Sequence, residues 1–239
     1  MKTVCYGIFL AFYILPIAHA HSGESVSEID IGYDSHYISE GRNNLTDGGI
    51  VWTTLSHALR DEFMFIAAYG LATHDNADYD ELNLTLAYQQ EFANLAYILS
   101  YTRLAFFKDG QFDNELALST HVNGLSVVTP TLDLVYSTQA NGYFAEFGLQ
   151  IEFAITPEIY FIPYVKVAFD YGYADRANDG HNHSTLGGAM DISLGKTRSM
   201  QLIAEHAIGG SFIARQANTE RQQSWLGVHI ISRFWAHFQ

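Results

Sequence analysis

The chain has 239 residues, of which 48% are hydrophobic and 14% are aromatic, and its formal net charge at pH 7 is -14. This acidic excess makes nucleic acid and anionic membrane surfaces poor partners, because like charges repel. No window after residue 20 is apolar enough to span a bilayer as a helix, which needs roughly 20 apolar residues. A mature chain that resides in a membrane would therefore have to be a β-barrel.

The first 20 residues predict a secretory signal peptide. Lys2 precedes an apolar run over residues 4–17, and the small residues Ala18 and Ala20 close it. The run is short for a spanning helix, and its small-x-small ending predicts cleavage after Ala20. Residues 1–20 are therefore expected to be removed on export.

The mature chain, residues 21–239, is expected to form one outer-membrane barrel. The single cysteine, Cys5, lies in the signal segment, so no disulfide is expected. Apolar and polar residues alternate in about twelve segments, which is the pattern of strands with two different faces. Strands are expected around residues 28–34, 51–59, 63–71, 82–89, 95–107, 115–122, 132–136, 143–153, 159–170, on both sides of 195–198, and at 225–238.

The connections between these segments alternate in length. With both chain ends in the periplasm, connections after odd-numbered strands should be long and face outward, and the others should be short turns. Most fit this rule. Residues 123–130 are long for an inner turn, and 139–141 are short for an outer loop.

The last segment shows the alternation most clearly. One parity is almost entirely apolar and comprises Leu226, Val228, Ile230, Phe234, Ala236 and Phe238. The other parity is mixed and partly charged, with Trp225, Gly227, His229, Ile231, Arg233, Trp235 and His237. This pattern predicts a strand between lipid and water.

Two other folds explain the pattern less well. Apolar residues at i, i+2 and i+4 would wrap around a helix instead of forming a stripe. Strands of a soluble β-sandwich usually run to roughly 5–6 residues, whereas these approach the roughly 9–11 that cross a bilayer with tilt. The sequence predicts an all-β protein, a transmembrane antiparallel up-and-down β-barrel of about 12 strands.

Aromatic residues are expected to form girdles at the two membrane interfaces. Those near outer strand ends are Tyr33, Tyr37, Tyr69, Tyr171, Tyr173 and Trp225, and those near inner ends are Phe63, Phe92, Phe153, Phe234 and Phe238.

The segment Asp34-Ser-His-Tyr-Ile-Ser-Glu-Gly-Arg-Asn-Asn-Leu45 resembles the opening motif of the uncharacterised proteobacterial outer-membrane barrels called Gcw_chp. The Pro130–Tyr136 strand and the following Tyr143-Phe144-x-Glu146 strand add to the resemblance. Many members place Arg directly before the Gly, whereas here Glu40 precedes it and Arg42 follows. The resemblance implies an outer-membrane barrel and implies no substrate or catalytic residues.

The charged residues opposite the apolar parity are expected to line the lumen. They are Glu28, Asp30, Asp34, Arg103, Glu115, Asp133, Glu146, Glu152, Lys166, Asp170, Asp191, Glu205 and Arg233. Because most of them are acids, a water-filled pore would favour cations over anions. About eight strands just fill their interior with side chains and 16 or more leave a wide channel, so twelve indicate a narrow pore or a small-solute uptake porin for cationic or neutral solutes.

A second hypothesis is a non-conducting structural or adhesive barrel. In it, Lys166 and Arg233 would lie between Glu146, Glu152, Asp170 and Asp191 in a closed network that plugs the lumen. Burying these charges without partners would cost several kcal/mol.

Enzymatic chemistry and cofactors are not predicted. A lipid hydrolase is a third, weaker hypothesis, because no G-x-S-x-G motif occurs and Ser119 and His121, though on one face, are about 7 Å apart. His181 and His183, two residues apart in an extended loop, would share a side and could ligate zinc. A polar, solvated loop explains them without a metal, so no metal site is predicted.

The chain end predicts one partner. Outer-membrane barrels resemble one another in ending on an aromatic residue that the assembly machinery recognises, and Phe238 is expected to be that signal. The other partner expected is outer-membrane lipid.

Overall fold

The computed structural model describes residues 24–45, 47–60, 62–74, 79–123, 127–177, 179–211, 213 and 220–237. The predicted signal peptide and its cleavage site lie outside these residues, as does Phe238. None of the described residues forms a helix that is long and apolar enough to cross a membrane.

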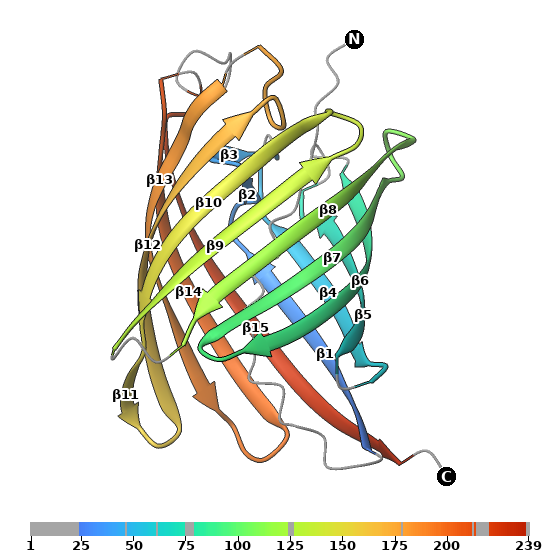
Figure 1. Cartoon of the computed structure of the whole chain (residues 1–239), viewed down its shortest axis with the longest axis vertical. Coiled ribbons are helices and arrows are strands. Elements are labelled where there is room, and N and C mark those ends of the chain that lie inside the picture. Colours follow the sequence, from blue (N-terminus) through green and yellow to red (C-terminus); the bar gives the residue numbers. More distant parts are fainter. Residues whose placement is uncertain are drawn as a thin grey trace.

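The described strands form a closed antiparallel barrel of 12 strands, as predicted (Figure 1). In chain order they are β1 (Glu24–Asp34), β4 (Ile50–Ala58), β5 (Phe63–Ala72), β6 (Asp80–Phe92), β7 (Leu95–Phe106), β8 (Gln111–Val122), β9 (Val128–Ser137), β10 (Gly142–Ile151), β12 (Ile159–Tyr171), β13 (Asp179–Ser193), β14 (Arg198–Gly209) and β15 (Gln222–His237). Each strand pairs with the next, and β1 pairs with β15 to close the wall. The short β11 (Phe153–Thr156) pairs with β12 beyond the end of β10.

Long connections lie at one end of the barrel, which we call the outer end. β1 ends there, whereas the first residue of β1 pairs with the last residue of β15 at the other end, the inner end. The predicted short outer loop occurs between β9 and β10, over residues 138–141. The seventh barrel strand is longer than predicted, because β9 begins at Val128, four residues before Leu132. The inner turn before it is correspondingly shorter.

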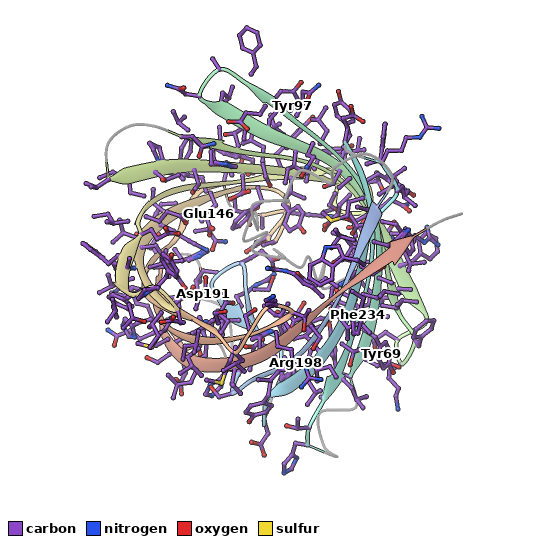
Figure 2. All side chains as sticks on the ribbon, turned by 90° about the horizontal axis from the view of Figure 1, so that it is seen from below. Tyr69, Tyr97, Glu146, Asp191, Arg198 and Phe234 are labelled. Atoms are coloured by element: carbon purple, nitrogen blue, oxygen red, sulfur yellow. The ribbon has the colours of Figure 1, made fainter. Side chains whose placement is uncertain are left out.

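The two parities of each strand meet different surroundings. On β15, Leu226 is 64% exposed, and on β13 Leu186 is 63% exposed, although both side chains are apolar. On β5, Ile66 and Ala68 of the opposite parity are buried. Figure 2, a view along the barrel from below, shows Tyr69 and Tyr97 on the outside of the ring of strands. Apolar side chains on an outer wall of this kind fit a lipid environment.

Glycines on the inward parity make room for large rings. A Cβ atom on Gly32 would lie 2.1 Å from Nδ1 of His229, and one on Gly70 would lie 2.4 Å from the Trp52 ring. Because each glycine lies directly opposite its ring in the strand register, the ring can lie flat against the inner wall.

The first outer loop does not stay outside the barrel. It carries a small hairpin of β2 (Ile38–Ser39) and β3 (Arg42–Asn43), and Figure 1 shows both strands within the outline of the barrel near its upper end. Its base is closed by a hydrogen bond from the Asn44 amide to the Tyr37 carbonyl, 2.8 Å long. The loop therefore fills part of the outer lumen.

Apolar packing holds this loop in place on one side of the lumen. Its Tyr37 and Leu45 join a buried cluster whose other members are Ile50, Tyr79, Leu104 and Phe106. A second buried cluster lies on another part of the wall and comprises Val135, Phe144, Ala168 and Tyr173. The prediction that Tyr37 and Tyr173 belong to a membrane girdle was therefore wrong, because both side chains are buried in these interior clusters.

Candidate channel lumen

The structure places most of the expected lumenal residues on the inward parity. Strand register gives this directly: Glu28 is opposite Arg233, Glu146 is opposite both Asp133 and Ala168, and Asp191 is opposite Gln201. Figure 2 shows Glu146 and Asp191 pointing into the ring of strands. The residues on this parity are Glu28, Asp30, Asp34, Glu115, Asp133, Glu146, Lys166, Asp170, Asp191, Glu205 and Arg233.

Arg103 lies on the outer face instead, which corrects the prediction. It is opposite the exposed Leu84, and its guanidinium carbon lies 3.8 Å from the centroid of the Phe112 ring. Its Nη1 donates a hydrogen bond to Asn114 Oδ1 at 2.9 Å. The neighbouring Leu104 points inward into the buried cluster at the outer end, so the alternation forces Arg103 outward.

Glu152 also differs from its expected place. It lies between β10 and β11, where the strand is interrupted, and it is exposed. The structure brings it to neither Lys166 nor Arg233 by any described ion pair.

Four of the buried acids among the described residues were not predicted: Glu40, Asp80, Glu81 and Asp113. Glu81 has the parity of Asn83, and Asp113 has that of Glu115, so extending the alternation toward the strand ends would have found both. Glu40 belongs to the inserted hairpin, and no sequence pattern indicates that a polar loop folds inward.

Two ionic groups bridge the seam between β1 and β15. Arg233 Nε lies 2.9 Å from Glu28 Oε2. His229 lies between two carboxylates, with Nδ1 3.1 Å from Asp30 Oδ2 and Nε2 3.3 Å from Asp34 Oδ1. These contacts join the first strand to the last on the lumenal side.

Polar contacts on β12 to β15 tie several inward side chains to the wall. Tyr164 and Trp225 both donate to Glu205, at 2.8 Å and 3.2 Å. Gln201 donates to Asp191 Oδ1 at 2.8 Å. Carboxylates in this half of the wall are therefore held by neutral donors.

Lys166 pairs with Glu146, whose Oε1 lies 3.2 Å from Nζ, while the second Glu146 oxygen lies 3.6 Å from His183 Nε2. Asp170 is occupied differently: it accepts hydrogen bonds from the backbone amides of Tyr173, Ala174 and Asp175. The described ion pair of Lys166 is with Glu146 and that of Arg233 is with Glu28, so these two pairs use different carboxylates.

The tip of the hairpin spans the lumen. Arg42 donates from Nη2 to Glu40 Oε2 at 3.2 Å and from Nη1 to the Ala174 carbonyl, beyond β12, at 3.2 Å. The position of a Cβ atom on Gly41 would be 2.8 Å from His183 Cβ on β13. A loop that begins at β1 thus contacts the wall at β12 and β13.

Tyrosines connect this region to buried acids on the wall. Tyr37 donates to Glu81 Oε2 at 3.0 Å, and Tyr79 donates to the same oxygen. Tyr173 donates to Glu115 Oε1. Both carboxylates are buried, and each is satisfied at least in part by a phenol.

The loop groups have shifted proton affinities. Burial raises the pKa of Glu40 to about 7, although the neighbouring Arg42 lowers it. Burial also raises the pKa of Tyr37 and of Tyr173 well above the usual range, and nearby carboxylates add to this. The carboxyl of Glu40 therefore titrates in the neutral range while the hairpin is inserted.

The two histidines of the possible metal motif do not share a side. The register between β12 and β13 shifts between Ala168 and Phe169, so His183 is opposite the buried Ala168, whereas His181 is opposite Phe169. His183 is buried and His181 is exposed. Among the described residues, no group of three His, Cys, Asp or Glu side chains could hold a metal ion.

Comparison with known proteins supports the fold. No family model matches the chain, and no curated protein sequence matches it. The chain is similar to a solved KdgM porin, with a TM-score of 0.61, 12% identity, and coverage of 87% of this chain and 99% of that chain. A KdgM porin in complex with disordered oligogalacturonate gives a TM-score of 0.59, 10% identity, and coverage of 87% and 99%.

A NanC porin structure is also similar, with a TM-score of 0.58, 5% identity, and coverage of 86% of this chain and 98% of that chain. The fold is thus the porin-like fold of outer-membrane β-barrels. The resemblance to Gcw_chp barrels stays a prediction, because no family model matches the chain.

Proposed function

We propose that this chain is a narrow outer-membrane channel that prefers cations and takes up small cationic or neutral solutes. The observation that carries the proposal is the charge of the inward parity. Acids recur there on strands around the barrel, whereas the inward Lys and Arg of the described barrel strands are Lys166 and Arg233, to which the inserted hairpin adds Arg42. A lumen of this charge lowers the energy of a cation and raises that of an anion.

The same charge bears on the ligand. One similar structure is a KdgM porin with oligogalacturonate, which is a polyanion. An acidic wall would repel such a chain at every step of its passage. Oligogalacturonate is therefore not an expected ligand of this protein.

The inserted hairpin favours a second candidate, a non-conducting structural or adhesive barrel. Glu40, Gly41 and Arg42 are buried within the outer lumen, and the tip contacts the wall at His183 and Ala174. A barrel closed in this way at all times would not conduct. In either role the barrel lies in outer-membrane lipid, and the assembly machinery inserts it with Phe238 as the signal. Neither role is enzymatic.

Ion selectivity tests the proposal. Purified protein in planar bilayers under a KCl gradient should give small current steps with a reversal potential that indicates cation preference. Asp133→Asn combined with Asp191→Asn should reduce this preference, and Lys166→Gln should increase it. Arg103→Gln is the matched control, because that side chain lies on the outer face and should leave selectivity unchanged. Anion preference would overturn the proposal. It would also be overturned if both the folded wild-type barrel and a folded barrel without the hairpin gave no current at all.

A further inference from the structure

We propose that the β2–β3 hairpin is a gate that closes the outer lumen while Glu40 is protonated and withdraws when Glu40 is ionised. This inference rests on the proposed channel function and adds to it the element that opens the pore and the signal that controls it. Three features of the structure support it: the anchors of the hairpin, the contacts of its tip, and the groups that surround Glu40.

The anchors and the tip of the hairpin are held by different forces. Tyr37 and Leu45, on either side of the hairpin, are 6% and 5% exposed in an apolar cluster with wall residues. The tip has a polar contact instead, from Arg42 to the Ala174 carbonyl, and its Gly41 lies close to the His183 side chain with no room for a Cβ atom between them. Polar contacts can be replaced by water, whereas exposing the apolar anchors is costly. The tip can therefore move while its two anchors stay on the wall.

The fixed points also lie close together. The Asn44 amide donates to the Tyr37 carbonyl at 2.8 Å, so the six residues 38–43 form a flap on a closed base. Glu40 and Gly41 at its tip have positive φ angles, 45° and 70°. Positive φ is unfavourable for Glu, so the tip is in a conformation that wall contacts must hold.

Glu40 is surrounded chiefly by acids and their phenol partners. From its own loop, Arg42 and Tyr37 interact electrostatically with Glu40. From the elements packed around it, the interacting groups are Glu81 of β6, Glu115 of β8, Asp170 of β12 and Tyr173 beyond β12. His183 of β13 lies against the adjacent Gly41. Arg42 is the one cation that the described geometry pairs with Glu40. An ionised Glu40 would add a further negative charge to this buried group.

The direction of the pH effect follows from these surroundings. In the inserted hairpin, burial raises the pKa of Glu40 from its ordinary value of 4.5 to about 7. Between these values the inserted state binds more protons than the withdrawn state, so insertion is strongest below about pH 4.5 and weakens as pH rises through 7. A shift of this size changes the ratio of open to closed channels on the order of 100-fold across that range.

The test measures open and closed dwell times of single channels at pH 5 and pH 8. Wild type should be mostly closed at pH 5 and open far more often at pH 8. Glu40→Gln, which keeps a neutral side chain of the same shape, should stay closed at both pH values. Asp109→Asn changes an exposed acid in another outer loop and should keep the wild-type response.

A hairpin deletion separates the gate from the channel. An Asn-Gly turn in place of residues 38–43 can join Tyr37 to Asn44, because two residues suffice for a tight hairpin. Folding is checked by heat-modifiable migration on gels. This variant should conduct equally at pH 5 and pH 8. If this variant folds and never conducts, the proposed channel function is wrong. If it conducts, but wild type and Glu40→Gln respond to pH in the same way, the channel function stands and the proposed gate is wrong.

Discussion

Arg233 on the last strand and Glu28 on the first are joined by an ion pair of 2.9 Å across the seam that closes the barrel. The pair is only partly shielded, since the Arg233 side chain is 37% exposed. We expect a double-mutant cycle with Glu28→Gln and Arg233→Gln to give a coupling energy of about 0.5–1 kcal/mol. Urea unfolding of the barrel in lipid vesicles measures it.

A cycle between Glu28→Gln and Lys166→Gln provides the control. Lys166 pairs with Glu146 on another part of the wall, so the two changes should be additive. A Glu28–Arg233 coupling no larger than this control would show that this ion pair does not stabilise the seam.

Gly32 determines where His229 lies, which leads to a second prediction. A Cβ atom on Gly32 would be 2.1 Å from His229 Nδ1, so Gly32→Ala must push the ring out from between Asp30 and Asp34. We expect a loss of about 1–3 kcal/mol in the free energy of unfolding. Gly188→Ala is the matched control, because Gly188 is also in a strand. A Cβ atom added there would lie 3.0 Å from the edge of the Phe161 ring, compared with 2.1 Å from His229 Nδ1 for Gly32. Equal losses for both variants would contradict the role of Gly32.

The sequence was sufficient for the barrel because lipid imposes one simple rule on every strand. The alternation at Leu226, Val228 and Ile230 has a single physical cause, and the register of β15 follows it. Wherever one face of a strand was clearly apolar, the same rule showed which of its residues face the lumen. This is why Glu28 and Arg233 could be placed on the same face from the sequence.

The rule fails where the interior is also apolar. Leu104 and Phe106 point inward into a buried cluster at the outer end, so both parities of β7 carry apolar residues and Arg103 could not be assigned correctly. The bulge that separates His181 from His183 depends on pairing with β12. Neither local pattern nor spacing contains these long-range contacts.

The Tyr37 hydroxyl holds the base of the hairpin to the wall, and its loss should loosen the hairpin. Tyr37→Phe keeps the ring in the apolar cluster but removes the donor to Glu81 Oε2, at a cost of about 1–3 kcal/mol for the buried carboxylate. We expect faster trypsin cleavage after Arg42, which is 8% exposed in the inserted hairpin. Mass spectrometry of the fragment that begins at Asn43 measures this rate at pH 6, where the wild-type hairpin is expected to be mostly inserted. An unchanged rate would mean that the ring alone anchors the loop.

Gly41 at the tip of the hairpin should be the position where a single methyl group has the largest effect on insertion. Its φ is 70°, and an added Cβ atom would lie 2.8 Å from His183 Cβ and 3.0 Å from Asn182 Oδ1. Gly41→Ala therefore combines an unfavourable backbone angle with a clash against the wall, whereas withdrawal of the tip relieves both. We expect trypsin to cleave after Arg42 much faster than in wild type.

Gly110→Ala separates the two causes. Gly110 also has a positive φ, 62°, in an outer loop, but a Cβ atom there would meet nothing within 4 Å. The backbone cost alone, about 1 kcal/mol, should leave cleavage after Arg42 at the wild-type rate, because that loop does not contact the hairpin tip by any described bond. If Gly41→Ala is cleaved no faster than Gly110→Ala, close contact with His183 does not hold the hairpin in the lumen.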